Sequence, residues 1–165
     1  MAKVKILNDF TIRKATIKDL KDILKLNFEL FKKEYKEFDK SLNLGWTYSK
    51  EGKKFFRDVI IKKDNFIEVV ENKNGIVGYL NGGMAKRIPW REEARYAFLG
   101  SVFIDKKFRA KGLGTKLTKD FINWCKGNNV DYLSVMASAQ NNLGINFYRK
   151  AGFKDYDLTL QIKLS

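Results

Sequence analysis

The sequence predicts an α/β fold in which a mixed, mostly antiparallel sheet is flanked by helices. Apolar residues recur at helical spacing in four segments, and short apolar or alternating runs typical of strands lie between them. An Asn-Gly pair at Asn74 and Gly75 joins two of these runs as a hairpin. The 165 residues are expected to form one domain over residues 1–165, since a domain commonly holds about 100–200 residues.

The composition excludes several kinds of chemistry. The chain has no His and one Cys, so it lacks the usual zinc ligands, an internal disulfide and the Ser-His-Asp or Cys-His catalytic arrangements. No metal site is expected. Residues 1–10 hold no apolar run before small cleavable residues, and no window reaches the roughly 18 apolar residues of a membrane span. We therefore expect a cytoplasmic protein without a membrane partner.

The chain is strongly basic, with 33 Lys and Arg against 19 Asp and Glu, a net charge of +14 and an isoelectric point near 9.8. Such a charge attracts polyanions: nucleic acid, an anionic membrane or a phosphate-rich cofactor. It does not distinguish among them, and a lysine-rich solvated surface explains the excess equally well.

The first third of the chain is expected to hold one strand and two helices. Residues 12–15 form a short strand, after which Thr16 caps a helix with Asp19 in its first turn. The buried face of this helix carries Leu20, Ile23, Leu24, Phe28, Phe31 and Tyr35. The periodicity breaks over residues 36–49, a loop that mixes acids with aromatics. Ser49 then caps a second helix, whose apolar side holds Phe55, Phe56, Val59 and Ile60.

The middle of the chain predicts strands. Residues 65–71 and 76–84 pair through the Asn74-Gly75 hairpin. Residues 87–93, which hold the one proline, form a connecting loop. Residues 94–105 form a long, largely apolar strand, and this favours a central position in the sheet.

The last third begins with a basic, glycine-containing turn over residues 106–114. It leads into a helix with Leu117, Phe121, Trp124 and Cys125 at helical spacing, so Cys125 is expected to be a buried thiol rather than a nucleophile. A strand over residues 132–137 and a helix over about 142–150 follow, with Gly152 as a stop signal. Alternating apolar residues complete the chain: Leu158, Leu160, Ile162 and Leu164.

The turn before the third helix has the chemistry of an anion site. A helix begins with unpaired backbone N–H groups, and Gly112 and Gly114 let an anion approach the backbone without meeting a Cβ atom. Arg109, Lys111 and Lys116 add positive charge. The spacing is neither that of the Walker loop nor Gly-x-Gly-x-x-Gly, and a glycine-rich turn by itself more often only starts a helix.

Two motifs make the interpretation specific. The run Arg109-Ala110-Lys111-Gly112-Leu113-Gly114 resembles the Arg/Gln-x-x-Gly-x-Gly/Ala signature of the GNAT family of N-acetyltransferases. Further on, Asn141, Phe147-Tyr148, Lys150 and Gly152-Phe153 resemble the Asn-to-Phe-Tyr-x-Lys-x-Gly-Phe segment of that family. Residues 12–16 with Asp19-Leu20 are similar to its first strand and helix, so the resemblance covers nearly the whole chain.

The resemblance implies a GNAT-like sheet that splays open between the strand ending near Asp105 and the strand over residues 132–137, with acetyl-CoA in the gap. The pyrophosphate is then expected on the backbone of Arg109, Ala110, Lys111, Gly112, Leu113 and Gly114. The pantetheine arm is expected to pair with the main chain of Val102, Phe103 and Ile104, as an added strand does, and to lie near Asn141. Part of the +14 charge would then serve the phosphates of coenzyme A.

The resemblance also implies how acetyl transfer would run. Tyr148 matches the position where the family commonly places a general acid beside the bound cofactor, and a phenol can protonate a departing thiolate. The alternative is that Tyr148 is a core residue of the last helix whose hydroxyl is satisfied by a neighbour. A backbone N–H near Ile104 would stabilise the acyl oxygen. No carboxylate occupies the positions of a base on the long strand, so the base is left open: Glu92, Glu93 or an acid of residues 34–39 acting through water, or an amine that arrives deprotonated.

The acceptor is expected to be a primary amine that approaches from the side of the first two helices. Glu34 and Asp39, with Glu37, would attract an ammonium group, while Trp46 and Tyr48 would pack on its carbon skeleton or anchor their loop to the core. A polyamine, an amino sugar, a peptide N-terminus and a lysine all fit. No nucleic acid is required, and a monomer or a homodimer is expected. Two other functions stay open: an acyl-CoA sensor without activity, and a basic nucleic-acid-binding protein.

Overall fold

The computed structural model describes residues 5–7 and 9–164; Met1–Val4, part of the stretch predicted to carry no leader, lie outside the described residues. In the described part, six strands form one sheet in the order β1-β2-β3-β4-β5-β6. The strands are β1 (Lys5–Leu7), β2 (Phe10–Lys14), β3 (Asn65–Asn72), β4 (Gly75–Met84), β5 (Tyr96–Ile104) and β6 (Tyr132–Val135). Only β5 and β6 pair in parallel. The predicted mixed, mostly antiparallel sheet is confirmed.

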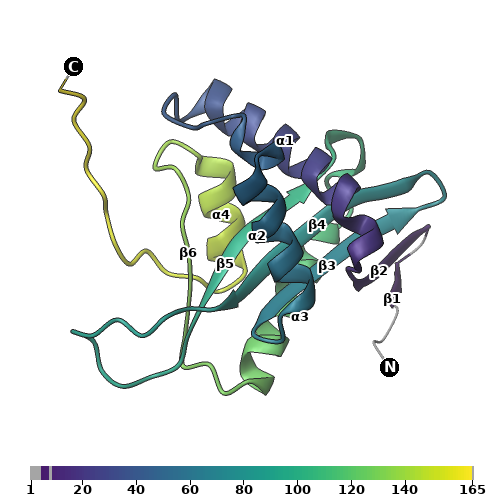
Figure 1. The fold of residues 1–165 in the computed structure, drawn as a ribbon. Helices are drawn as coiled ribbons and strands as arrows, with labels where there is room; N and C mark the ends of the chain where they lie inside the picture. Colours follow the sequence, from purple (N-terminus) through teal and green to yellow (C-terminus); the bar gives the residue numbers. More distant parts are fainter. Residues whose placement is uncertain (1–4, 8, 165) are drawn as a thin grey trace.

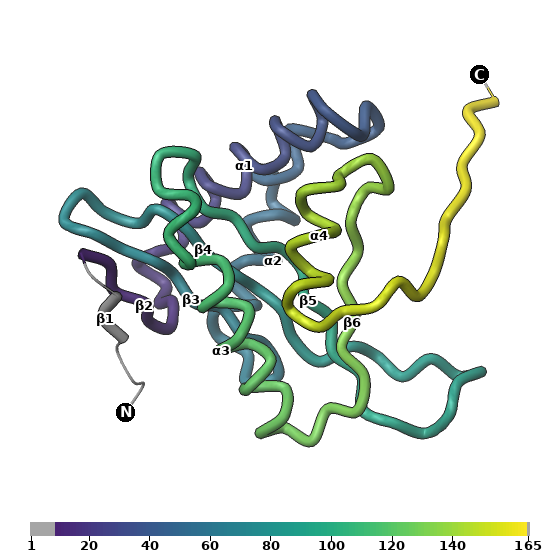
Figure 2. Tube along the Cα trace, turned by 180° about the vertical axis from the view of Figure 1, so that it is seen from behind, coloured from purple at the N-terminus to yellow at the C-terminus, as the bar shows by residue number. Residues whose placement is uncertain are grey.

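The helices cover both faces of this sheet. Helices α1 (Leu20–Glu37) and α2 (Lys50–Ile61) cross one face, and α3 (Leu113–Gly127) lies behind it, as the two opposite views show (Figure 1, Figure 2). The short helix α4 (Asn142–Lys150) follows β6. Successive residues of a strand point to opposite faces, so Tyr79 joins the core under α1 and α2 while Leu80 joins the core under α3.

The start of α1 follows from three neighbouring residues. The backbone N–H of Thr16 donates to Asp19 Oδ2 at 2.7 Å and the Thr16 hydroxyl donates to the same oxygen at 3.0 Å. Both guanidinium nitrogens of Arg13 donate to the Asp19 carboxylate, at 2.8 and 3.0 Å. The Arg13 guanidinium holds the pKa of Asp19 below its ordinary value. The predicted role of Asp19 in the first turn is confirmed, with a one-turn 3-10 helix, Ile17–Asp19, before α1.

The sheet opens between β5 and β6, as predicted. The two strands pair only from Tyr96 to Leu99 on β5, whereas β5 pairs with β4 up to Ile104. The opening coincides with a bulge, because Asn81 faces Ser101 and Gly82 faces Leu99, so that Gly100 has no partner on β4. A Cβ atom at Gly100 would lie 2.5 Å from Asn81 Nδ2, so a larger residue there would displace the Asn81 side chain.

Several predicted boundaries differ from the structure. The first long strand is Phe10–Lys14 rather than residues 12–15; the strand predicted over 94–105 is Tyr96–Ile104, and that over 132–137 ends at Val135. The predicted loop over residues 36–49 contains the end of α1 and a 3-10 turn, Trp46–Tyr48. Strand β1 lacked a clear apolar signal and was not predicted.

The alternating C-terminal segment is the main departure from the predicted elements. Residues 153–164 are extended but join no strand in the described structure. Leu158, Leu160, Ile162 and Leu164 are 74–88% exposed. Alternating apolar residues indicate a strand with one apolar face. A strand also needs a neighbouring strand to bond, and the alternation does not show where that neighbour is. Among the described residues, no helix is both long and apolar enough to span a membrane.

Candidate functional site

The turn between β5 and α3 leads into a helix whose first backbone N–H groups have no intrahelical partner. Gly112 precedes the first residue of α3 with φ +75°, a conformation that favours glycine, and an added Cβ there would meet no atom within 4 Å. The first intrahelical bond runs from Lys116 N to Gly112 O at 2.9 Å, which leaves the amides of Leu113, Gly114 and Thr115 at the helix start. The start of a helix with such amides is a favourable place for a phosphate group.

Gly114 differs from Gly112 in its surroundings. An added Cβ at Gly114 would lie 3.6 Å from the Phe147 ring, in ordinary van der Waals contact, so its missing side chain faces α4 rather than open space. Leu113 is 2% exposed and contributes only its backbone to the turn. Ala110 has φ +60°, an uncommon value for a residue other than glycine. Two residues of this turn, Ala110 and Gly112, therefore have positive φ, which sets the path of its backbone.

Three cations surround the turn, and they are held differently. Arg109 Nε donates to the carbonyl of Ile104 at 2.8 Å, and its guanidinium carbon lies 5.3 Å from the centre of the Phe103 ring. The Lys111 ammonium lies 5.4 Å from the centre of the Phe10 ring. Lys116 is paired with Asp120 at 2.7 Å, so its charge is partly compensated. Arg109 is therefore the most firmly positioned of the predicted cations.

The last residues of β5 present their backbone to the opening. The side chains of Phe103 and Ile104 are buried on opposite faces of the sheet, and Val102 is half-buried against the core that holds Ile104. In the described structure, no strand pairs with the β6-facing edge of β5 beyond Leu99. The edge ends at Ile104, whose Cγ1 lies 4.0 Å from where a Gly114 Cβ would be, so an extended group lying along it would reach the start of α3 with its far end.

Tyr148 and Glu34 are brought together from α4 and α1. Tyr148 packs against the core that includes Leu99 and Ile104, and burial, followed by the charge of Glu34, raises its pKa to about 12. Burial also raises the pKa of Glu34, against smaller lowering effects from the charge of Lys33 and from a Ser138 hydrogen bond. The predicted acid and one member of the predicted acidic segment thus share one site.

Asn141 has a structural role beside its predicted one. Its Oδ1 atom accepts a hydrogen bond from Gly144 N at 2.9 Å and caps α4. The amide nitrogen of Asn141 lies 2.7 Å from where a Gly144 Cβ would be, so Gly144 leaves room for this cap. The carbonyl oxygen of Asn141 is engaged by its own helix, which leaves the amide nitrogen as the donor for a ligand.

The other residues predicted to bind the amine substrate make their contacts with residues other than Tyr148. Glu37 is exposed and Lys33 lowers its pKa; hydrogen bonds from Ser41 lower the pKa of Asp39. Trp46 stacks on Phe31 at 5.7 Å between ring centres and packs against the core under α1 and α2. These contacts explain Trp46 as an anchor of its turn.

The sequence analysis did not predict a buried series of hydrogen-bonded polar side chains. The Tyr79 hydroxyl lies 3.0 Å from both Asn27 Nδ2 and Ser101 Oγ; Thr47 Oγ1 donates to Asn27 Oδ1 at 2.7 Å, and Ser101 also bonds Asn81. The chain joins α1 to the Gly100 bulge. Burial raises the pKa of Tyr79 to about 12. A signal was present, because Asn81 is a lone polar residue inside a mostly apolar strand.

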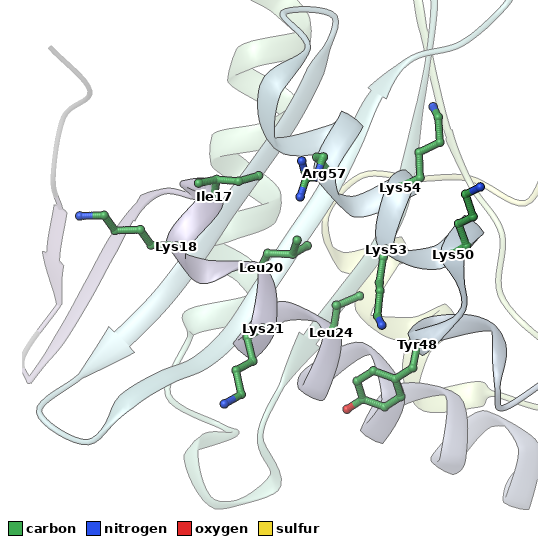
Figure 3. A pocket seen from close by; sticks show the side chains of 10 residues that line it. All are labelled: Ile17, Lys18, Leu20, Lys21, Leu24, Tyr48, Lys50, Lys53, Lys54 and Arg57. Carbon is green, nitrogen blue, oxygen red and sulfur yellow. The ribbon is translucent and has the colours of Figure 1, made fainter.

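A separate pocket of about 740 Å³ opens between the start of α1 and α2. Its apolar floor includes Ile17, Leu20 and Leu24, and Tyr48 lines one end. Figure 3 shows the basic side chains around it, among which Lys18, Lys21 and Lys54 point in different directions and do not converge. None of the residues predicted to bind the cofactor lines this pocket.

Two known proteins are similar to this chain in sequence. At 27% identity it is similar to an uncharacterized N-acetyltransferase of Methanocaldococcus jannaschii, with 93% of this chain and 64% of that protein covered. The chain therefore spans just under two thirds of that relative's length. At 29% identity it is similar to streptothricin acetyltransferase A of Bacillus subtilis, over 86% of this chain and 84% of that one.

A solved structure shares the fold. A predicted acetyltransferase of Clostridium acetobutylicum, determined with acetyl-CoA, superposes with a TM-score of 0.76 at 20% identity, over 94% of this chain and 96% of that one. These matches place the chain in the acetyltransferase class of proteins. It belongs to the acetyltransferase (GNAT) family, whose model matches residues 20–153. The resemblance stated from its motifs is confirmed.

Proposed function

We propose that this enzyme moves an acetyl group from acetyl-CoA to a primary amine by direct attack, with both substrates bound at once. The observation that supports this most strongly is the unpaired edge of β5, which runs from the Gly100 bulge to Ile104, beside the start of α3. Acetyl-CoA supplies the activated acyl group when bound. The open space at Gly112 and the free edge of β5 fit its diphosphate and its extended arm.

Binding would use two kinds of contact. The amides of Leu113, Gly114 and Thr115, with Arg109 and Lys111, would hold the diphosphate, because charge-assisted bonds to such groups are strong. The main chain of Val102, Phe103 and Ile104 would pair with the arm, and the Asn141 amide nitrogen would donate to it. Arg109 would serve both contacts, since it ties Ile104 to the turn.

Proton transfer would use Tyr148 and Glu34. With its pKa raised to about 12, Tyr148 stays protonated at neutral pH and can donate to the departing sulfur. Glu34 would attract the ammonium of the acceptor and take its proton, directly or through water. Burial raises the pKa of Glu34, and this makes its carboxylate a stronger base than an exposed carboxylate. A backbone N–H at the end of β5 would meet the negative charge that develops on the acyl oxygen.

The acceptor class is an amine, either small or part of a peptide. Glu34, Glu37 and Asp39 lie near the end of α1 and are consistent with a cationic acceptor. One relative is named for streptothricin, which makes that antibiotic a reasonable probe.

A thiol-release assay tests the proposal. The enzyme is given acetyl-CoA and a panel of polyamines, amino sugars, streptothricin and lysine peptides, and release of the free thiol of coenzyme A is followed. Release that requires an amine supports amine acetylation. Binding of coenzyme A without release for any amine would instead favour an acyl-CoA sensor, and no binding would overturn the proposal.

A further inference from the structure

The buried series of polar side chains has a direction, because each of its hydrogen bonds has a defined donor. Thr47 Oγ1 donates to Asn27 Oδ1 at 2.7 Å, and Asn27 Nδ2 donates to the Tyr79 hydroxyl at 3.0 Å. Ser101 Oγ donates its hydrogen to Asn81 Oδ1. A hydroxyl group has one hydrogen, so Tyr79 is the donor in its 3.0 Å bond to Ser101. The series therefore runs from Thr47 to Asn81, and each member donates to the next.

Asn81 ends the series with a donor that the protein does not use. Asn81 is 3% exposed, and in the part of the chain that the structure describes no atom accepts a hydrogen bond from its Nδ2 atom. This atom lies 2.5 Å from where a Cβ atom of Gly100 would be, and Gly100 is exposed. The side chain that Gly100 lacks therefore leaves room beside the donor. A buried donor without an acceptor costs free energy, so an acceptor brought by a ligand would be bound favourably there.

The unused donor lies close to the proposed acid and base. Asn81 follows Tyr79 by two residues in β4, so both side chains point to the face of the sheet that α1 and α2 cover. After burial, the charge of Glu34 and then that of Tyr79 are the causes that raise the pKa of Tyr148. The series thus ends on the same side of the sheet as the groups proposed to transfer protons.

Gly100 also lies at the end of the β5 edge where the thioester is expected. The other end of this edge, at Ile104, lies beside the start of α3, where the diphosphate of the cofactor would be held. An arm that extends along the edge from Ile104 would carry its acetyl group to the Gly100 end. An amine that attacks this group from the side of α1 would pass Asn81 Nδ2.

We propose that Asn81 Nδ2 donates a hydrogen bond to an oxygen of the acceptor, on or next to the carbon beside the amine-bearing carbon. This assignment rests on the proposed function and adds the substrate class: an amine with a neighbouring hydroxyl or carbonyl oxygen. An amino sugar supplies the hydroxyl, and the N-terminus of a peptide supplies the carbonyl. A plain alkylamine or a polyamine offers no such oxygen and leaves the donor unpaired, which disfavours it as a substrate.

Matched amines test the assignment through release of the coenzyme A thiol. The compound trans-2-aminocyclohexanol is compared with cyclohexylamine, and alaninamide is compared with sec-butylamine, which lacks the carbonyl. In the wild type, kcat/KM should be at least about tenfold higher for the oxygen-bearing amine of a pair. A preference in the first pair assigns a hydroxyl, as in an amino sugar. A preference in the second assigns a carbonyl, as at a peptide N-terminus.

Two variants separate the hydrogen bond from the intrinsic reactivity of each amine. In Asn81→Asp the side chain still accepts from Ser101 but the donor is replaced by an acceptor, so the preference should disappear. Gly100→Ala, at an exposed position, fills the space beside Nδ2 and should also reduce the preference. The matched control Asn72→Asp makes the same change at the β3–β4 hairpin, where Oδ1 accepts from Asn74 N, and should keep it. Thermal unfolding shows whether each variant is folded.

The outcomes distinguish the assignment from the proposed function. Thiol release in which the oxygen-bearing amines react no faster than their partners overturns the assignment alone. A preference that survives in both Asn81→Asp and Gly100→Ala does the same. An equal loss of rate for all four amines in Asn81→Asp would place the donor on the acyl oxygen instead and also overturns it. No release with any amine contradicts the proposed function, and the assignment then falls with it.

Discussion

Arg109 Nε donates a hydrogen bond to the carbonyl oxygen of Ile104 at 2.8 Å, which ties the last residue of β5 to the turn before α3. The guanidinium also lies against the Phe103 ring, so one side chain fixes the relation between the strand edge and the open helix start. These are the two surfaces that the proposed cofactor would span.

Replacing Arg109 with Ala should weaken coenzyme A binding by about 10- to 100-fold, because a hydrogen bond to a charged group contributes about 1.5–3 kcal/mol. Isothermal titration calorimetry measures the change. Arg87→Ala is the control, since Arg87 is exposed in the loop between β4 and β5 and should bind coenzyme A as the wild type does. Equal losses in both variants would indicate a general effect of net charge.

Replacing Tyr148 with Phe should lower kcat by about 10²- to 10⁴-fold, the usual contribution of a general acid, with little change in coenzyme A affinity. The ring and its packing against Phe147 and Phe153 are kept, so a fold defect is not expected. Because the pKa of Tyr148 is about 12, its ionisation should cause no loss of rate up to about pH 10. A variant with unchanged kcat would assign Tyr148 to packing alone.

The pH dependence of kcat/KM should report Glu34. A base must be deprotonated to act, and burial raises the pKa of Glu34, so activity should fall as the pH drops through a value above that of an ordinary glutamate. Glu34→Gln should lower kcat/KM and remove this acidic limb. Exposed Glu29, on the same helix, provides the control Glu29→Gln, which should keep the limb in place. A limb that persists in Glu34→Gln would exclude Glu34 as the base.

Asp19 should make stability depend on pH. Its pKa is lowered in the folded state, mainly by Arg13, so its stabilisation is present above the unfolded pKa and is lost as the pH falls through the lowered folded value. Asp19→Asn should reduce the free energy of unfolding at neutral pH by about 1–3 kcal/mol, and the difference from wild type should shrink in acid. Urea titrations at several pH values measure this, with exposed Asp22→Asn as the control.

Removing the Tyr79 hydroxyl should destabilise the fold. Tyr79→Phe leaves Asn27 Nδ2 without its buried acceptor, at a cost of about 1–3 kcal/mol. Tyr96→Phe is the matched control, because its hydroxyl makes an exposed bond to the Glu92 carbonyl. Urea unfolding should show a lower midpoint for Tyr79→Phe alone; identical midpoints would mean that the buried chain adds no stability.

Features that depend on neighbours in the sequence were predicted well. The bonds between Thr16 and Asp19 span three residues, Ser49 accepts from Gly52 N to cap α2, and Asn74-Gly75 turns between β3 and β4. In each, the side chain and the backbone it bonds lie within one turn, so local chemistry decides the outcome.

Features that depend on distant residues were not predictable from the sequence. Arg13 bonds Glu71, 58 residues away, and Asn27 bonds Tyr79, 52 residues away. The effect of the Glu34 charge on the pKa of Tyr148 is of the same kind, since it needs α1 and α4 to be placed by the sheet. The C-terminal segment shows the reverse case: its alternation was visible, but in the described structure it pairs with no strand.

The central claim is that the backbone amides at the start of α3 hold the diphosphate of coenzyme A. Calorimetry with coenzyme A and with pantetheine, which lacks the diphosphate, tests it in the wild type and in Gly112→Ala. Gly75→Ala is the control, because Gly75 also has positive φ and open space around it. We predict that the wild type binds coenzyme A at least about tenfold more tightly than pantetheine, and that only Gly112→Ala loses this difference. Equal affinity of the wild type for both ligands, or an undiminished preference in Gly112→Ala, would contradict the claim.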